Sequence, residues 1–282
     1  MDGTLLAPGD VILPETRKKL MALQEQGIVL ILASGRSYSR LLPYEKELGM
    51  DKHKGYLIEV DGIALYETDT DRREVLRRMQ PEEIRDIYKE CMELGTEPQA
   101  CYDDGFFYYF NDDIKKVKER LRQEQNLPED FPWTAGPWNW LTDSRNGYPH
   151  QTFITDPAQI DRPINKIQLM QDADRIAEIY PILMKKYGDR FEIFRTCPRQ
   201  LEILPKGYSK GHTLKRIMER NGWKPEEVAV FGDGENDVSL FDVADHSYAM
   251  ANAADYVKEK ARQVTASNAD NGIVKALEEL GL

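Results

Sequence analysis

Four short polar segments of this chain carry residue types that could bind and cleave a phosphate ester. They are Asp2-Gly3-Thr4, Ser34-Gly35-Arg36, Lys210, and the acidic run from Gly232 to Asp237. Three of them follow predicted parallel strands, and Lys210 begins a predicted helix close to one. Because open α/β sheets bind ligands at the carboxyl ends of their strands, the four segments are expected to meet at one edge of a sheet.

The acidic run is the most informative of the four segments taken alone. Asp233 and Asp237 are four residues apart, with glycine and a polar turn between them, so their carboxylates can converge above one strand end. Two like charges that close are costly unless a cation sits between them. Oxygen ligands of this kind suit Mg²⁺. A solvated acidic turn explains this segment, taken alone, equally well.

Ser34, Gly35 and Lys210 add groups that suit an anion. Ser34 offers a hydroxyl, Gly35 a backbone N–H that can approach closely, and the helix that follows adds its positive end. Taken singly, Ser34-Gly35-Arg36 is explained by a surface turn and Lys210 by an exposed helix lysine. An Asp, a Ser, a Lys and an acidic pair in this order at successive βα ends favour one shared phosphate site.

The elements that must position these residues alternate between helix and strand. Pro14 opens a predicted helix that stops at Gly27, and the apolar run 28–33 is typical of a strand buried on both faces of a parallel sheet. A second strand is predicted at 56–60, followed by a turn at Asp61-Gly62. Alternating helices and buried strands are predicted again after Pro205, with a helix capped by Ser209 and a strand at 228–231.

The middle of the chain differs in its predicted elements and in its composition. Amphipathic helices and short strands fill residues 80–127, and the segment 128–152 is rich in Pro and Trp without periodicity. The sequence therefore predicts an α/β fold. It has a doubly wound, Rossmann-like parallel-sheet core made of residues 1–79 and 190–282, interrupted by an inserted α+β cap domain at residues 80–189.

Composition limits the partners. The chain of 282 residues carries 38 Lys and Arg against 49 Asp and Glu, a net charge of −11, which argues against a nucleic-acid surface. No apolar run reaches the roughly 18 residues of a membrane span. Cys91, Cys101 and Cys197 lie far apart and are expected to be free thiols. A cytoplasmic protein acting on a small phosphorylated metabolite is expected, without nucleic acid or membrane.

Asp2-Gly3-Thr4, together with Phe231 to Asp237, resembles the haloacid dehalogenase superfamily of phosphatases, whose first motif reads Asp-x-Asp-Gly-Thr. Over nearly its whole length the chain resembles the Cof-type branch, in which a large C2 α/β cap lies between the second and third motifs. The resemblance implies a Mg²⁺-dependent phosphatase. It would hydrolyse small phosphate monoesters, such as sugar phosphates, through an aspartyl-phosphate.

The resemblance also implies roles for particular residues. The phosphate would be held by Ser34, the N–H of Gly35, Arg36 and Asn236, and Lys210 would neutralise nucleophile and phosphate.

For the metal and the proton, the resemblance implies three aspartates. Asp2 would be the general acid/base and would hold Mg²⁺ through its backbone carbonyl. Asp233 would bind Mg²⁺ directly, with Asp237 as a ligand or as the group that holds the ligand.

The nucleophile of the first motif falls outside this sequence. Met1 occupies the x, so the attacking Asp would lie one residue before Met1, at the end of a central strand of about five apolar residues. A doubly wound sheet without that strand would leave two rows of backbone groups unpaired, each costing about 1–3 kcal/mol. We therefore expect the native protein to extend upstream of Met1. The alternatives are a catalytically inactive phosphate-binding or regulatory protein and a phosphomutase.

Two features have no settled role from sequence. Asp61-Gly62 stands where the family commonly has Asn-Gly, and a turn residue is the favoured interpretation. Trp133, Trp138 and Trp140, with Arg199, could recognise the non-reacting part of a substrate or could simply pack. The identity of the substrate and the oligomeric state are not predicted.

Overall fold

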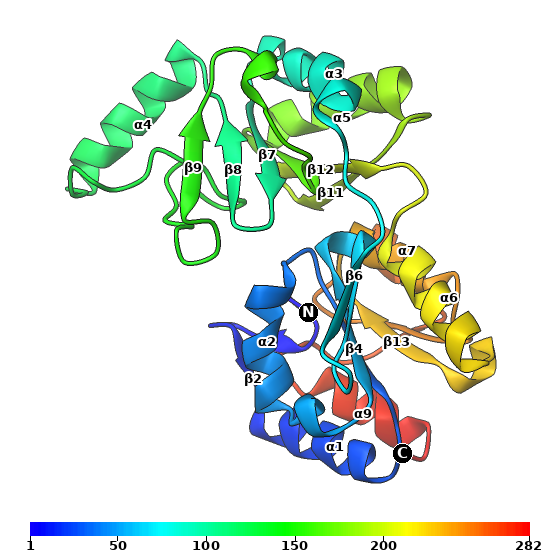
Figure 1. Cartoon of the computed structure of the whole chain (residues 1–282). Coiled ribbons are helices and arrows are strands. Elements are labelled where there is room, and N and C mark those ends of the chain that lie inside the picture. Colours follow the sequence, from blue (N-terminus) through cyan, green and yellow to red (C-terminus); the bar gives the residue numbers. More distant parts are fainter. The chain divides into compact units, whose positions relative to one another are not determined.

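The computed structural model describes residues 1–282, which fold as two units. Unit 1 consists of residues 1–76 and 208–282, and unit 2 consists of residues 77–207. Figure 1 shows the elements of each unit along the chain.

Unit 1 contains two sheets and a short hairpin. One sheet has the order β3 (Leu30–Ala33), β4 (Gly55–Glu59), β5 (Ala64–Glu67), β6 (Arg72–Val75), and the other has the order β13 (Ala229–Gly232), β14 (His246–Ala249), β15 (Gln263–Val264). The hairpin pairs β1 (Leu6–Ala7) with β2 (Val11–Ile12). The β3–β4 pair and the whole second sheet are parallel, while β4–β5 and β5–β6 are antiparallel.

The helices of unit 1 begin and end where local chemistry predicts. They are α1 (Pro14–Glu25), α2 (Tyr38–Glu47), α6 (Lys210–Asn221), α7 (Val238–Phe241), α8 (Asp255–Lys258) and α9 (Gly272–Glu279). α1 starts with proline at its first position. The Ser209 hydroxyl caps α6 by accepting a hydrogen bond from the His212 N–H at 3.2 Å. Short 3₁₀ turns lie at Met50–Lys52, Val60–Gly62, Pro225–Glu227 and Glu235–Asp237.

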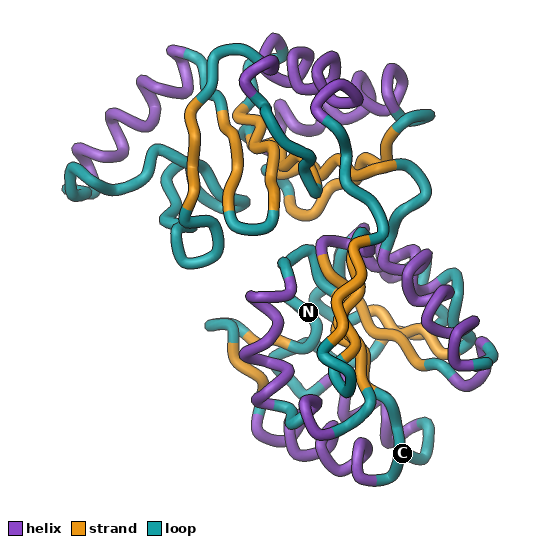
Figure 2. Tube along the Cα trace, viewed as in Figure 1, coloured by secondary structure: helices purple, strands orange, loops and turns teal.

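No strand lies between β3 and β13. β3 is the end strand of its sheet and β13 is the end strand of the other, so each has one edge without a strand partner. The two strand groups are separate in Figure 2.

Unit 2 is a six-stranded sheet with helices packed on it. The strand order is β11 (Phe191–Cys197), β12 (Gln200–Pro205), β10 (Lys166–Met170), β7 (Glu97–Tyr102), β8 (Gly105–Tyr108), β9 (His150–Phe153). All neighbours are antiparallel except β8 and β9. α3 (Pro81–Glu93) and α5 (Ala173–Tyr187) bury their apolar stripes in one core cluster with this sheet, and α4 (Asp112–Glu124) packs in a separate cluster with Trp140. A 3₁₀ turn lies at Pro157–Gln159.

The structure corrects the predicted domain boundaries. The sequence predicts residues 190–207 in the core, but they lie in unit 2, because β12 pairs with β10 on one side and with β11 on the other. Ile203 stands opposite Ile167 on β10 and Ile193 on β11. A strand bonded on both sides within a sheet cannot belong to a different unit, so the chain returns to unit 1 only at Tyr208.

The Pro- and Trp-rich segment is fastened to unit 2 by buried polar contacts. Lys118 and Glu97 form an ion pair with no exposed side-chain surface. Lys118 also donates to the Trp133 carbonyl oxygen, and Glu97 accepts from the Ala135 N–H at 2.6 Å. The Trp140 ring is buried under the Arg199 guanidinium, 4.7 Å from the ring centre. Trp140 therefore packs.

No helix of the structure combines the length and the apolar character that crossing a membrane requires.

Candidate active site

Lys210 lies at the centre of the group of polar residues in unit 1. Its Nζ is 2.7 Å from Asp237 Oδ1 and 3.6 Å from Asp61 Oδ1, and its side chain is 3% exposed. Burial by itself lowers the pKa of Lys210, but the attraction of the two carboxylates outweighs it, and the pKa is raised above its ordinary value. The ammonium is therefore charged at neutral pH and fixed at the first turn of α6.

Both carboxylate oxygens of Asp237 accept hydrogen bonds from other groups of the protein. Oδ1 accepts from Lys210, and Oδ2 accepts from the backbone N–H groups of Asp233 (3.0 Å) and Gly234 (3.1 Å). Burial raises the pKa of Asp237, but Lys210 and the N-terminal amino group more than offset this, so the pKa is lowered. Of the two roles predicted for Asp237, this geometry fits the one in which it holds the loop and the lysine.

Asp233 presents a carboxylate that is less completely satisfied. Its Oδ1 accepts from the Thr4 hydroxyl at 2.5 Å. Burial and the neighbouring Asp237 raise its pKa, because the amino group, Thr4 and Lys210 oppose them only in part. A Cβ on Gly3 would lie 2.1 Å from Asp233 Oδ2, and Gly3 has a φ of +69°, so only glycine lets Asp2-Gly3-Thr4 approach this carboxylate.

Asp2 is paired with Arg36, which differs from the predicted role of Arg36 as a phosphate ligand. Arg36 Nε donates to Asp2 Oδ2 at 3.1 Å, and its Nη2 donates to Asp2 Oδ1. The guanidinium also donates to Asp10 and to the Tyr44 hydroxyl, each at 3.2 Å. Burial raises the pKa of Asp2, but the amino group and Arg36 lower it further, so the carboxyl is ionised at neutral pH.

Ser34, Gly35 and Asn236 surround Asp61. The Asp61 N–H donates to the Ser34 carbonyl oxygen at 2.9 Å, and Asn236 Nδ2 donates to Asp61 Oδ1 at 2.8 Å. A Cβ on Gly35 would meet Asp61 Oδ2 at 2.8 Å. The Ser34 hydroxyl accepts from the Arg36 N–H at 3.2 Å. The residues predicted to hold phosphate are thus brought together, with an additional carboxylate among them.

Asp61, which the sequence predicts as a turn residue, also lies among the site residues. It is 1% exposed and has a φ of +56°, a conformation that Asp tolerates better than most residues. Its position two residues after the end of β4 is the sequence signal for this role, because β4 ends at the same edge as β3. A turn residue at that edge is also a site residue.

The balance of charge in this site suits a divalent cation. Four carboxylates, those of Asp2, Asp61, Asp233 and Asp237, face only two side-chain cations, Lys210 and Arg36. No group of three or more His, Cys, Asp or Glu side chains is placed to enclose a metal. Mg²⁺ is ordinarily held by one or two protein carboxylates with waters and substrate phosphate completing its shell, and the residues present fit that pattern.

A family model described as haloacid dehalogenase-like hydrolase matches residues 1–277. The chain belongs to the haloacid dehalogenase-like hydrolases. Among its relatives is pyridoxal phosphate phosphatase YbhA of Escherichia coli, which is 26% identical over 98% of this chain and 94% of its own length. Another is 5-amino-6-(5-phospho-D-ribitylamino)uracil phosphatase YwtE of Bacillus subtilis, 25% identical over 99% of this chain and 96% of its own length.

Solved structures agree with this assignment. A haloacid dehalogenase-like hydrolase from Bacteroides thetaiotaomicron aligns with a TM-score of 0.72 and 25% identity, over 99% of this chain and 96% of its own. The subclass IIB sugar phosphatase BT4131 aligns with a TM-score of 0.71 at 20% identity, over 100% of this chain and 96% of its own, and supports the fold. The predictions of a haloacid dehalogenase-like hydrolase, of an α/β fold with a cap, and of a phosphatase-type enzyme are confirmed.

Proposed function

We propose that this haloacid dehalogenase-like hydrolase is a Mg²⁺-dependent phosphatase of small phosphate monoesters, such as sugar phosphates, and that it acts through an aspartyl-phosphate. The observation that carries the proposal is the buried Lys210 ammonium, fixed between Asp237 and Asp61 beside Ser34, Gly35 and Asn236. A fixed cation flanked by hydrogen-bond donors is what phosphoryl transfer needs, since that reaction depends on positioning and charge neutralisation. Bound Mg²⁺ would add further charge neutralisation at the phosphate, with Asp233 and the Asp2 carbonyl as its protein ligands.

The attacking carboxylate in this proposal belongs to an aspartate joined directly before Met1. The Met1 nitrogen lies 3.3 Å from the Ala33 carbonyl oxygen, so a residue joined there stands beside the site. Its carboxylate oxygen would bond to phosphorus as the bond from phosphorus to the alcohol oxygen breaks. Two displacements of this kind replace one difficult hydrolysis.

Asp2 would carry the proton in both steps. In the first it donates a proton to the departing alkoxide, and in the second it removes a proton from the water that attacks the aspartyl-phosphate. The hydrogen bond from Arg36, which lowers the pKa of Asp2, suits the second step. For the first step, substrate phosphate would draw Arg36 away from Asp2, and the loss of that partner would raise the pKa and let the carboxyl hold its proton.

The experiment compares three forms of the protein on p-nitrophenyl phosphate and a panel of sugar phosphates, with Mg²⁺ or with EDTA. The forms are residues 1–282, the same chain preceded by a short apolar segment ending in Asp, and a matched control whose segment ends in Asn. We expect Mg²⁺-dependent turnover in the Asp form only. Equal turnover in the Asn form would refute the role given to the added carboxylate, and turnover in none would support a phosphate-binding protein without catalysis.

A further inference from the structure

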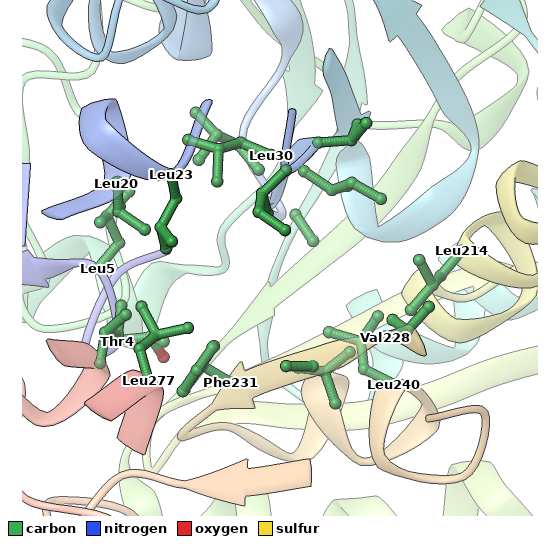
Figure 3. Close-up of a pocket in the computed structure, with 18 of the residues that line it drawn as sticks. Thr4, Leu5, Leu20, Leu23, Leu30, Leu214, Val228, Phe231, Leu240 and Leu277 are labelled. Carbon is green, nitrogen blue, oxygen red and sulfur yellow. The ribbon is translucent and has the colours of Figure 1, made fainter. Parts of the chain in front are cut away.

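The segment from Ser34 to Tyr38, which we call the anion loop, joins β3 to α2 and carries groups predicted to hold phosphate. Before the loop, β3 packs through apolar side chains. Figure 3 shows Leu30 of β3 with Leu20 and Leu23 of α1 around one apolar pocket. Apolar packing is non-directional, so it fixes where β3 lies but does not orient the N–H groups of the anion loop. Directional hydrogen bonds must do that.

Four hydrogen bonds tie the anion loop to β4 and to the turn after it. Three of them join backbone groups: Ser34 N–H to the Ile58 carbonyl oxygen at 3.0 Å, Asp61 N–H to the Ser34 carbonyl oxygen at 2.9 Å, and Val60 N–H to the Arg36 carbonyl oxygen at 3.1 Å. The fourth is accepted by a side chain. It is therefore the one that a substitution can remove while the backbone bonds stay in place.

Glu59, the last residue of β4, accepts this fourth hydrogen bond. Its Oε2 lies 3.0 Å from the backbone nitrogen of Tyr38, the first residue of α2. Ser37 stands at the N-cap position, but its side chain does not cap the helix. Glu59 thus supplies an acceptor to the first turn of α2 from 21 positions away in the sequence, a role that a local cap ordinarily fills.

Arg73 on β6 fixes the orientation of Glu59. Its Nε lies 3.0 Å from Oε1 and its Nη2 lies 2.9 Å from Oε2, a forked contact with a carboxylate that has no exposed surface. The guanidinium also lies over the Tyr38 ring, 4.6 Å from the ring centre. Arg73 therefore contacts both the carboxylate and the residue that donates to it.

The charge of Arg73 matters for an anion held by the same loop. A carboxylate at the N-terminal end of α2 is favoured by the helix dipole, but alone it would repel a phosphate bound nearby. The Arg73 guanidinium offsets the charge of Glu59. Glu59 can therefore hold the anion loop without opposing the phosphate.

We propose that Glu59 and Arg73 are positioning residues of the phosphate site. Arg73 orients Glu59, and Glu59 holds the anion loop, through the Tyr38 N–H, in the geometry that binds phosphate. Both act through the backbone of the loop, and both lie outside the four segments from which the sequence predicts the site. The inference rests on the proposed function, because it takes this loop to hold the phosphate.

The test uses residues 1–282 and variants that keep the net charge, so that long-range attraction of phosphate is the same in each. Arg73→Lys keeps the positive charge and loses the fork. The double variant Glu59→Leu with Arg73→Met removes both charges and the acceptor of the Tyr38 N–H. Replacing a buried ion pair by apolar side chains of similar volume is often neutral for stability. Arg72→Lys is the matched control, because Arg72 is an exposed neighbour on β6.

We expect inorganic phosphate, measured by calorimetry, to bind the double variant on the order of tenfold more weakly than the unmodified protein. Arg73→Lys should weaken binding by a smaller factor, and Arg72→Lys should not change it. Amide hydrogen exchange at Tyr38 should accelerate in the double variant, because the N–H loses its acceptor. The melting temperature of the double variant should stay close to that of Arg72→Lys, which separates positioning from loss of folding. If the double variant does not fold, the same two measurements on Arg73→Lys decide.

Equal phosphate affinity of the double variant and Arg72→Lys would overturn the proposal, since the anion loop would then bind phosphate without the bond from Glu59. Equal exchange at Tyr38 in these two variants would also overturn it. Absence of phosphate binding by the unmodified protein would instead contradict the proposed function. Exchange at Tyr38 would still decide whether Glu59 holds the loop.

Discussion

Replacing Lys210 by Met should destabilise unit 1 by removing the buried ammonium that contacts Asp237 and Asp61. The Met side chain fills a similar volume, so the effect reports charge and hydrogen bonding. Breaking a buried ion pair by removing one partner costs about 3–5 kcal/mol, because a buried charge is left uncompensated. For a unit of this size that corresponds to a fall in melting temperature of roughly 6–20 °C.

The dependence of this effect on pH follows from Asp237. In the unmodified protein Lys210 helps to hold the pKa of Asp237 below its ordinary value. This lowered pKa stabilises the fold at any pH above the ordinary pKa of Asp. The stabilisation is lost as the pH falls through the lowered pKa of the folded protein. Without Lys210, burial raises the pKa of Asp237, so the variant is penalised at neutral pH. The gap between Lys210→Met and the unmodified protein should therefore narrow as the pH is lowered from 7 towards 4.

Urea unfolding followed by circular dichroism measures both effects. Lys215→Met is the matched control, because Lys215 is exposed on the same helix and its loss should change stability by no more than about 0.5 kcal/mol. The double variant Lys210→Met with Asp237→Asn should recover part of the loss, since it removes the orphaned charge. If Lys210→Met unfolds with the same midpoint as Lys215→Met, the buried-pair reasoning is wrong.

Three other predictions test the surroundings of the site. Arg36→Gln should raise the pKa of Asp2, seen as a higher midpoint in a carboxyl ¹³C NMR titration; an unchanged midpoint would show that Arg36 does not set it. Asp61→Asn should strengthen the binding of inorganic phosphate, measured by calorimetry, on the order of tenfold. The substitution removes a negative charge that would repel the phosphate from the residues proposed to bind it. Gly62→Ala should destabilise the protein in urea by at least about 1–3 kcal/mol, because Gly62 has a φ of +106° and its Cβ would lie 2.1 Å from the Ser209 carbonyl oxygen; a neutral effect would contradict that close approach.

The elements that carry local signals could be predicted from the sequence. Pro14 and Ser209 mark helix starts that the structure contains at α1 and α6, and apolar runs mark β3, β4 and β13. Local hydrogen-bonding chemistry decides these features, so a short window of sequence is enough. The approach of Gly3 and Thr4 to Asp233 is the arrangement expected from the rule that parallel strands share a carboxyl edge.

The features that depend on distant partners could not be predicted. The short strands β11 and β12 have no local property that assigns them to unit 1 or unit 2, because only pairing with β10 does so. Arg36 is equally able to bind a phosphate or a carboxylate, and its contact with Asp2 comes from a residue 34 positions away. Asp61 is typical of a turn position. This local signal does not show that Asp61 lies among the site residues, because its neighbours there come from distant parts of the chain.

The division of unit 1 into two stretches of chain has a consequence for biosynthesis. Residues 77–207 form unit 2 from one continuous stretch, whereas residues 1–76 must wait for 208–282 before unit 1 can close. At about 5–20 residues per second, a ribosome needs roughly 7–26 seconds to make the intervening stretch. During that interval the apolar strands β3 and β4 are made but lack α6 and β13. Unit 2 should therefore fold first, and the early strands of unit 1 are the part of the nascent protein that most needs a chaperone.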